Sequence, residues 1–96
     1  MEPKKEVLSY VQWHKNRDDM AAAEKYPKFD CHGMTYLEVE DKFENWLLMN
    51  SGNLPLQIIT GNSEEMRAIV VKYLEKHKFT MYEVPAFNSG ALIVLQ

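Results

Sequence analysis

The stretch FDCHGMTYLEVEDKFENWLL, residues 29–48, carries the clearest fold signal of the chain. Its opening, Phe29–His32, is a short segment followed by Gly33, which is typical of a brief strand that ends in a turn. Thr35 and Glu38 are three residues apart, as in the capping box that begins many helices. Apolar side chains then repeat on one helical face, at Tyr36, Val39, Phe43, Trp46 and Leu47. The stretch therefore predicts a strand and a helix whose apolar face packs against a sheet.

A second strand and helix follow the first pair. Leu56–Ile59 is an apolar run typical of a strand covered on both faces. Thr60–Ser63 has the composition of a turn, and Ser63 is placed to cap a helix with an acidic first turn. The apolar stripe of this helix consists of Met66, Ile69, Val70, Tyr73 and Leu74. Positive charge at Lys76–Lys78 marks its C-terminal end.

Two more strands are expected at the C-terminus and one helix at the N-terminus. Phe79–Val84 and Ala91–Leu95 have strand composition and are separated by a turn at Asn88–Gly90. Glu6–Lys15 has helical spacing, with apolar residues at Val7, Tyr10 and Val11. The predicted fold is α/β, a two-layer βαβαββ sandwich with a mixed four-stranded sheet, preceded by an N-terminal helix.

The length and composition fit one domain with a short N-terminal extension. The 96 residues are 46% hydrophobic, and single domains usually have about 50 to 250 residues. We expect residues 1–28 to form the N-terminal helix and a connector, and residues 29–96 to form the domain. The sequence lacks an apolar run long enough for a membrane span or a secretory signal, and its single cysteine excludes an intrachain disulfide. These features predict a cytoplasmic protein without membrane contact.

The net charge limits how the chain could bind nucleic acid. It is −3 overall, although residues 1–28 contain six Lys/Arg and five acidic residues. Phosphate neutralisation by Lys and Arg dominates non-specific binding to nucleic acid. Any such contact must therefore be local.

The turns after the first two strands are the candidate site. A right-handed crossover makes these strands parallel, so both turns lie at one edge of the sheet, where α/β proteins usually bind ligands. On an extended backbone, Asp30 and His32 point to the same side and could act as an acid/base pair. Gly61 permits close backbone approach, the following helix begins with free N–H groups, and Arg67 adds positive charge. These features predict a phosphate site.

Residues 29–95 resemble the small MutS-related (Smr) domain. FDCHGMTYLEVEDKFENWLL is similar to the Asp-x-His-Gly turn and helix that open this domain, LQIITGNSEEMRAIVVKYL to its second half, and NSGALIVLQ to its last strand. The resemblance implies a nuclease or nucleic-acid-binding domain that acts on RNA or DNA. The chain departs from the family where the second motif usually reads His-Gly-Lys-Gly, because it has Thr60-Gly61-Asn62-Ser63.

The sequence leaves three functions open. The first is an endonuclease with Asp30 and His32 as catalytic residues beside a phosphate-binding set consisting of Gly33, Thr60, Gly61, Asn62, Ser63 and Arg67. The second is a non-catalytic nucleic-acid-binding or adaptor module of the same fold, since hydrolysis lacks the second His as a proton-transfer partner. The third is a protein-interaction domain. No protein metal site is expected, although Asp30 alone could hold a hydrated Mg²⁺.

Structural roles compete with these functional assignments. Asp30 and His32 could simply hydrogen-bond the turn and cap the next helix. Cys31 is expected to be a buried apolar residue, and either Trp13 or Phe87 could stack on a base.

Overall fold

The computed structural model describes residues 23–96, and their element order is the predicted βαβαββ. The predicted N-terminal helix, Glu6–Lys15, lies outside the described residues. The elements are β1 (Lys28–Asp30), α3 (Tyr36–Met49), β2 (Leu56–Ile59), α4 (Glu64–Lys76), β3 (Tyr82–Glu83) and β4 (Ala91–Val94).

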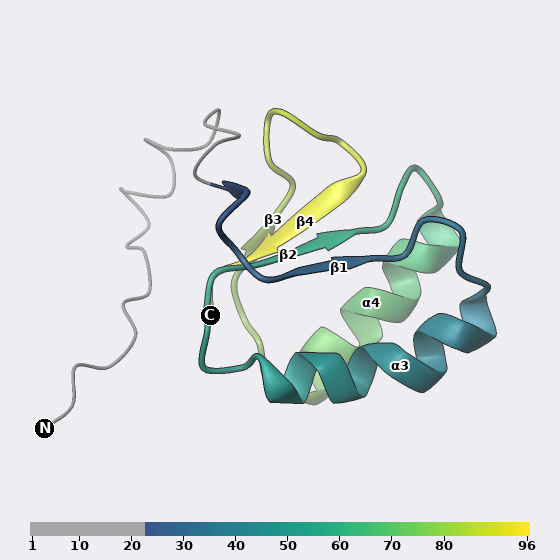
Figure 1. Ribbon diagram of the computed structural model, residues 1–96, viewed down its shortest axis with the longest axis horizontal. Coiled ribbons are helices and arrows are strands. Elements are labelled where there is room, and N and C mark those ends of the chain that lie inside the picture. The colour runs from purple at the N-terminus through teal and green to yellow at the C-terminus, as the bar shows by residue number, and fades with distance from the viewer. Residues whose placement is uncertain (1–22) are drawn as a thin grey trace, which may run out of the picture.

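The sheet is mixed, as predicted, with the strand order β1-β2-β4-β3. β1 and β2 are parallel, whereas β4 is antiparallel to both β2 and β3. Figure 1 shows α3 and α4 on the same side of this sheet, so the described residues form two layers. Because β1 and β2 are parallel neighbours, the turns that follow them meet at one edge. That convergence is the feature of the fold that makes a site.

Helix α3 begins where its sequence pattern predicts. The Thr35 side chain accepts a hydrogen bond from the Glu38 N–H at 3.1 Å, and the Glu38 carboxylate accepts one from the Thr35 N–H at 2.8 Å. This reciprocal capping box satisfies two N–H groups that a helix start otherwise leaves unpaired. The buried face of α3 consists of Val39, Phe43 and Leu47. The Phe43 ring lies 5.1 Å from that of Phe29 on β1, centroid to centroid, so helix and sheet meet through aromatic contacts.

Two strand boundaries differ from the sequence prediction. β1 ends at Asp30 rather than His32, because the Met34 N–H donates to the Cys31 carbonyl at 2.9 Å and closes a turn there. β3 has only two residues instead of the predicted Phe79–Val84. The N–H groups of Thr80 and Met81 both donate to the Gln96 carbonyl, at 2.9 and 3.1 Å, which interrupts the regular pairing of a ladder.

Carboxylates of α3 link this helix to α4 along their shared edge. Glu40 accepts hydrogen bonds from Lys72 and from the Tyr73 hydroxyl, each at 2.9 Å. Glu44 contacts Lys76 at 2.9 Å and His77 Nε2 at 2.6 Å. These two carboxylates are therefore paired across the two helices, because α4 presents cations at matching positions.

The Glu44 contacts make stability depend on pH. Hydrogen bonds from Lys76 and, second, from His77 lower the pKa of Glu44 from its ordinary value of 4.5. A carboxylate with a lowered folded-state pKa adds stability above the unfolded-state pKa and loses it as the pH falls through the folded-state value. Glu44→Gln should therefore lose less stability than the parent between pH 7 and pH 3, as measured by urea unfolding. Asp41→Asn, an exposed carboxylate of α3 that forms no salt bridge within residues 23–96, is the matched control and should behave like the parent.

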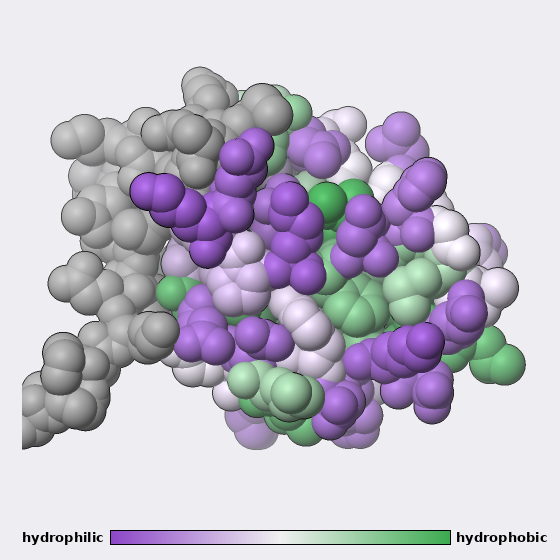
Figure 2. Space-filling model, in the orientation of Figure 1, coloured by the Kyte–Doolittle hydropathy of each residue, from purple (hydrophilic) through white to green (hydrophobic). Residues whose placement is uncertain are grey.

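Within residues 23–96, neither helix has the length and apolar character needed to cross a membrane. The surface seen in Figure 2 is a mosaic in which hydrophilic side chains border smaller apolar patches.

Candidate functional site

The turn after β1 is held by the Asp30 carboxylate. Asp30 Oδ1 accepts a hydrogen bond from the backbone N–H of His32 at 2.8 Å. The turn itself runs from Cys31 to Met34, with Gly33 at φ +80°, a left-handed conformation that favours glycine. Asp30 and Gly33 therefore both have a structural role in shaping the turn.

The predicted acid/base pair does not have the alignment that the sequence suggested. The same-side argument assumed extended backbone through His32, whereas β1 ends at Asp30 and His32 lies in the turn. The carboxylate binds the backbone of His32, not its imidazole. Both side chains are nevertheless exposed at the sheet edge, where a ligand could reach them.

Cys31, between these two residues, is buried as predicted, with 2% of its surface exposed. Burial and, second, the nearby Asp30 charge raise the pKa of its thiol to about 11. At pH 8 the thiolate fraction should be about 100-fold lower than that of an unperturbed thiol with a pKa near 8.5 to 9. We expect a thiol-specific reagent to label Cys31 at least that much more slowly in the folded protein than in urea. Equal labelling rates would show that the thiol is accessible and reactive.

The turn after β2 is fixed by the loop that precedes β4. The N–H groups of Thr60 and Gly61 both donate to the Gly90 carbonyl, at 2.8 and 2.9 Å. The Thr60 hydroxyl, which is almost fully buried, also donates to that carbonyl at 3.2 Å. Thr60 therefore anchors the turn, and the ligand-facing residues of this turn are those that follow it.

A pocket of about 160 Å³ lies at the N-terminus of α4 and is lined by Asn62, Ser63, Glu64 and Arg67. Ser63 caps the helix by accepting the Met66 N–H at 3.1 Å. The first N–H groups of a helix have no intrahelical acceptor, and this cap leaves those of Glu64 and Glu65 as donors for a ligand. The Arg67 guanidinium donates through Nη2 to the Ser89 carbonyl at 2.7 Å, which fixes the position of its charge.

The charged residues that line the pocket suit a single bound anion. Arg67 is the cation that lines it, whereas Glu64 brings a carboxylate to the same wall. The carboxylate of Glu65 is engaged with α3, because its Oε1 accepts a 2.6 Å hydrogen bond from the Tyr36 hydroxyl. Guanidinium groups and helix N-termini bind phosphate well, and the Glu64 charge opposes it. This arrangement can therefore bind a single phosphate weakly.

Comparison of the chain with family models, curated proteins and solved structures finds no match.

The structure brings together most of the predicted phosphate-binding residues. It adds two contacts that the sequence did not predict, from Arg67 to Ser89 and from Thr60 to Gly90. Asn62, Ser63 and Arg67 share one pocket, and Gly61 sits at φ +68° in the turn above it. Ser89 and Gly90 belong to a turn that the sequence predicted, but nothing in the sequence placed that turn against Arg67 and Thr60.

The position of Tyr36 at this edge also differs from the sequence prediction. Helical spacing assigned it to the packing face of α3, yet it is 44% exposed and its hydroxyl joins the N-termini of α3 and α4 through Glu65. The first turn of a helix extends past the sheet edge, so periodicity alone could not distinguish this position from the core positions that follow it.

Within the part of the chain that the structure describes, no group of three or more His, Cys, Asp and Glu side chains could hold a metal ion. A lone carboxylate such as that of Asp30 would need phosphate oxygens and water to complete an Mg²⁺ site.

Proposed function

We propose that this chain is a nucleic-acid-binding module that holds one backbone phosphate of RNA or DNA at the N-terminus of α4. The observation that carries the proposal is the pocket in which Arg67, fixed by Ser89, faces Asn62 and Ser63. A guanidinium held in place loses little side-chain freedom when a phosphate binds, and helix N–H groups complete the anion site.

Three further observations support a nucleic-acid site, and the third favours binding over turnover. The pocket lies at the sheet edge where the β1 and β2 turns meet. Residues 29–95 resemble the Smr domain, whose members bind or cut nucleic acid. The residue before Gly61 is a buried Thr60 and not the second His of the family motif, so a proton donor for the leaving oxygen is missing from this turn.

The overall charge sets the strength of the interaction that we expect. With a net charge of −3 and Glu64 in the pocket wall, binding should be weak and should fall steeply with salt. It should also be indifferent to sequence, because phosphate contacts carry no direct sequence information.

A test of this proposal uses Arg67→Ala and Lys78→Ala. Each variant removes one positive charge from α4 or its end. Lys78 lies beyond the C-terminal end of α4, which ends at Lys76, nine residues or about 14 Å along the helix from Arg67 at about 1.5 Å per residue. Titration of labelled single- and double-stranded RNA and DNA at several salt concentrations should show weaker binding for Arg67→Ala on every sequence. The slope of log K against log salt should become shallower by about 0.7 to 0.9, the value for one phosphate contact. Equal binding by the two variants would contradict a phosphate site at Arg67.

An endonuclease is the second candidate, favoured by the exposure of Asp30 and His32 beside the pocket. Its test is cleavage of the same substrates with and without Mg²⁺. Asp30→Asn retains an oxygen that can accept the His32 N–H while removing the charge, and His32→Gln removes the proton-transfer group. Cleavage abolished by both substitutions would establish catalysis. Binding without cleavage in the parent protein would favour the non-catalytic binding module over the endonuclease.

A further inference from the structure

The sheet face opposite the helices carries both polar and apolar side chains. Leu56 and Ile58 of β2 enter the core under α3 and α4, so Gln57, which lies between them, points to this second face. The strand register places Lys28 on one side of Gln57 and Ile93 on the other. Gln57 therefore lies on an interior strand, between a charged neighbour and an aliphatic one.

The side chain of Gln57 is buried without a hydrogen-bond partner. Only 5% of the residue is exposed. Its backbone N–H donates to the Pro27 carbonyl at 2.8 Å, but within residues 23–96 no group hydrogen-bonds its side-chain amide. Buried amides in folded proteins almost always have partners, because desolvation without a replacement hydrogen bond costs stability. An amide left unpaired in this way is available to a ligand.

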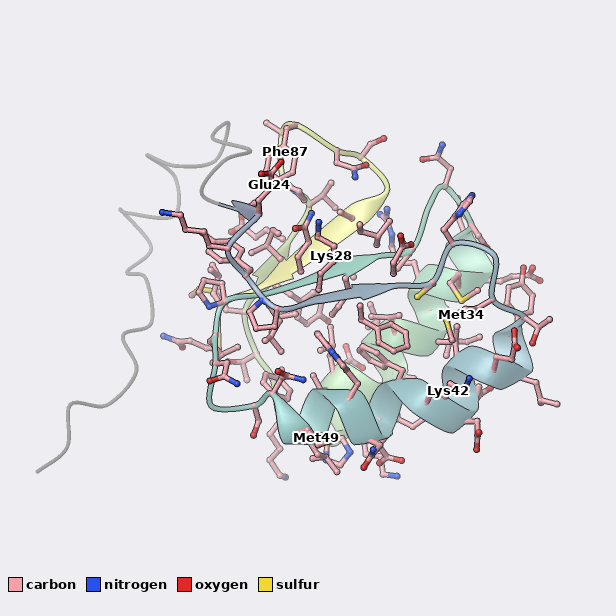
Figure 3. The ribbon with its side chains drawn as sticks, viewed as in Figure 1. Glu24, Lys28, Met34, Lys42, Met49 and Phe87 are labelled. Carbon is pink, nitrogen blue, oxygen red and sulfur yellow. The ribbon has the colours of Figure 1, made fainter. Side chains whose placement is uncertain are left out.

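The Gln57 amide faces a hollow of about 180 Å³ on this second face. The residues that line the hollow include Glu24, Lys28, Gln57, Ile59, Phe87 and Asn88. Figure 3 shows Glu24, Lys28 and Phe87 on the side of the sheet away from α3 and α4. The hollow has several times the roughly 30 Å³ that one water molecule occupies in the liquid. It is smaller than the roughly 300 Å³ at which pockets for drug-sized ligands begin, so its size suits a single small ring system.

Phe87 gives the hollow an aromatic wall. Its ring is half-buried, is not among the residues that pack against the apolar core, and has no ring contact within residues 23–96. Phe87 is one of the two aromatic residues that the sequence offers for stacking on a base, and the other, Trp13, lies outside the described residues. Glu24 and Lys28 are exposed, so the mouth of the hollow is polar while its walls are partly apolar.

We propose that this hollow binds an adenine-type base, with the Gln57 amide paired to the edge of the base and the Phe87 ring stacked on its face. A primary amide presents an acceptor oxygen and donor hydrogens side by side, so it can pair bidentately with the amino group and N7 of adenine. Aromatic side chains stack on bases because every base has a π face. The site is separate from the phosphate pocket at Arg67 and does not depend on it.

The base could belong to a free nucleoside or to a nucleic-acid strand. The loop before β4 connects the hollow with the phosphate pocket, because Asn88 lines the hollow and the next residue, Ser89, accepts the 2.7 Å hydrogen bond from Arg67. A strand could therefore run from one site to the other, whereas a nucleoside needs the hollow alone. The phosphate contact itself reads no sequence, so a preference for adenine within a strand would come from the hollow.

The direct test is NMR titration of the ¹⁵N-labelled full chain with adenosine, and purine riboside is the matched ligand. Purine riboside has the same rings and sugar but lacks the amino group. We expect adenosine to shift the side-chain amide resonances of Gln57. Purine riboside should bind roughly three- to tenfold more weakly, the usual loss for one hydrogen bond. Unmoved Gln57 amide resonances with adenosine, or equal binding of the two ligands, would overturn the proposal.

Two variants distinguish recognition from folding. Gln57→Leu retains the buried volume and removes the amide, so it should unfold at the same urea concentration as the parent or at a higher one, and it should bind the two ligands equally. Phe87→Ala should weaken the binding of both ligands at least about fivefold, because it removes the stacking contact. A Gln57→Leu protein that unfolds more easily would show that the amide already has a partner in the folded chain, and undiminished binding by Phe87→Ala would exclude stacking. Either result would contradict the proposal.

Arg67→Ala and two oligonucleotides identify the source of the base. Arg67→Ala should bind adenosine like the parent, because adenosine has no phosphate, so a failure of the phosphate site would leave this result intact. Loss of adenosine binding in Arg67→Ala would contradict a hollow that acts on its own. A preference of the parent for oligoadenylate over oligocytidylate of equal length, lost in Gln57→Leu, would identify a base within a strand. Equal binding of the two oligonucleotides, together with binding of adenosine, would identify the free nucleoside.

Discussion

Phe43→Ala is expected to destabilise the protein by about 3 to 5 kcal/mol, the usual cost of truncating a buried phenylalanine. The Phe43 side chain is fully buried at the centre of α3. Its ring meets those of Phe29, Trp46 and Tyr73 at centroid distances of 5.1, 6.0 and 6.3 Å. Truncation removes all three contacts and leaves a cavity where β1, α3 and α4 meet. Small domains have only about 5 to 15 kcal/mol of stability in total, so this variant should be at the limit of folding.

The measurement is urea unfolding at pH 7, beside two comparison variants. Phe43→Leu retains most of the buried apolar volume and should remain folded, with a loss well below that of alanine. Leu37→Ala removes an apolar side chain from the same helix at a position that is 79% exposed, and it should change stability by less than about 0.5 kcal/mol. A Phe43→Ala protein as stable as Leu37→Ala would place the core elsewhere.

The sequence predicted the helices well because their signals are local. The Thr35–Glu38 capping box and the Ser63 cap each lie within one helical turn, and the structure forms both. Apolar periodicity likewise identified Val39, Phe43 and Leu47 as core positions. The end of β1 and the brevity of β3 could not be predicted, because they depend on hydrogen bonds to Cys31 and Gln96 that compete with regular strand pairing.

The candidate site was predictable in its parts but not in its assembly. Parallel pairing of β1 and β2 brings the predicted turns to one edge, as expected. The role of Ser89 in holding Arg67 depends on a contact between residues 22 positions apart, and nothing local to either residue signals it. The burial of Thr60 has the same origin, since its partner Gly90 is 30 residues away.

Gly90→Ala is expected to cost about 3 kcal/mol, the upper part of the usual range for inserting a methyl group into a packed site. A Cβ at Gly90 would lie 3.0 Å from both Cα and the carbonyl carbon of Gly61 and 3.1 Å from its oxygen. These are backbone atoms, so no side-chain rotation can relieve the clash. Gly61 cannot simply withdraw, because its own N–H and that of Thr60 both bind the Gly90 carbonyl.

The same clash should weaken phosphate binding, since any shift of Gly61 moves the turn that positions Asn62 and Ser63. Gly52→Ala is the matched control, because a Cβ there meets no atom within 4 Å, and its stability and binding should stay near those of the parent. Urea unfolding and titration with single-stranded RNA at low salt measure the two effects on the same samples. Gly90→Ala should lose both stability and binding, because it disturbs the turn itself. Arg67→Ala should lose binding far more than stability, because it removes the charge and introduces no backbone clash in the turn. A Gly90→Ala protein that unfolds more easily but binds like the parent would show that the turn after β2 does not contribute to the phosphate site.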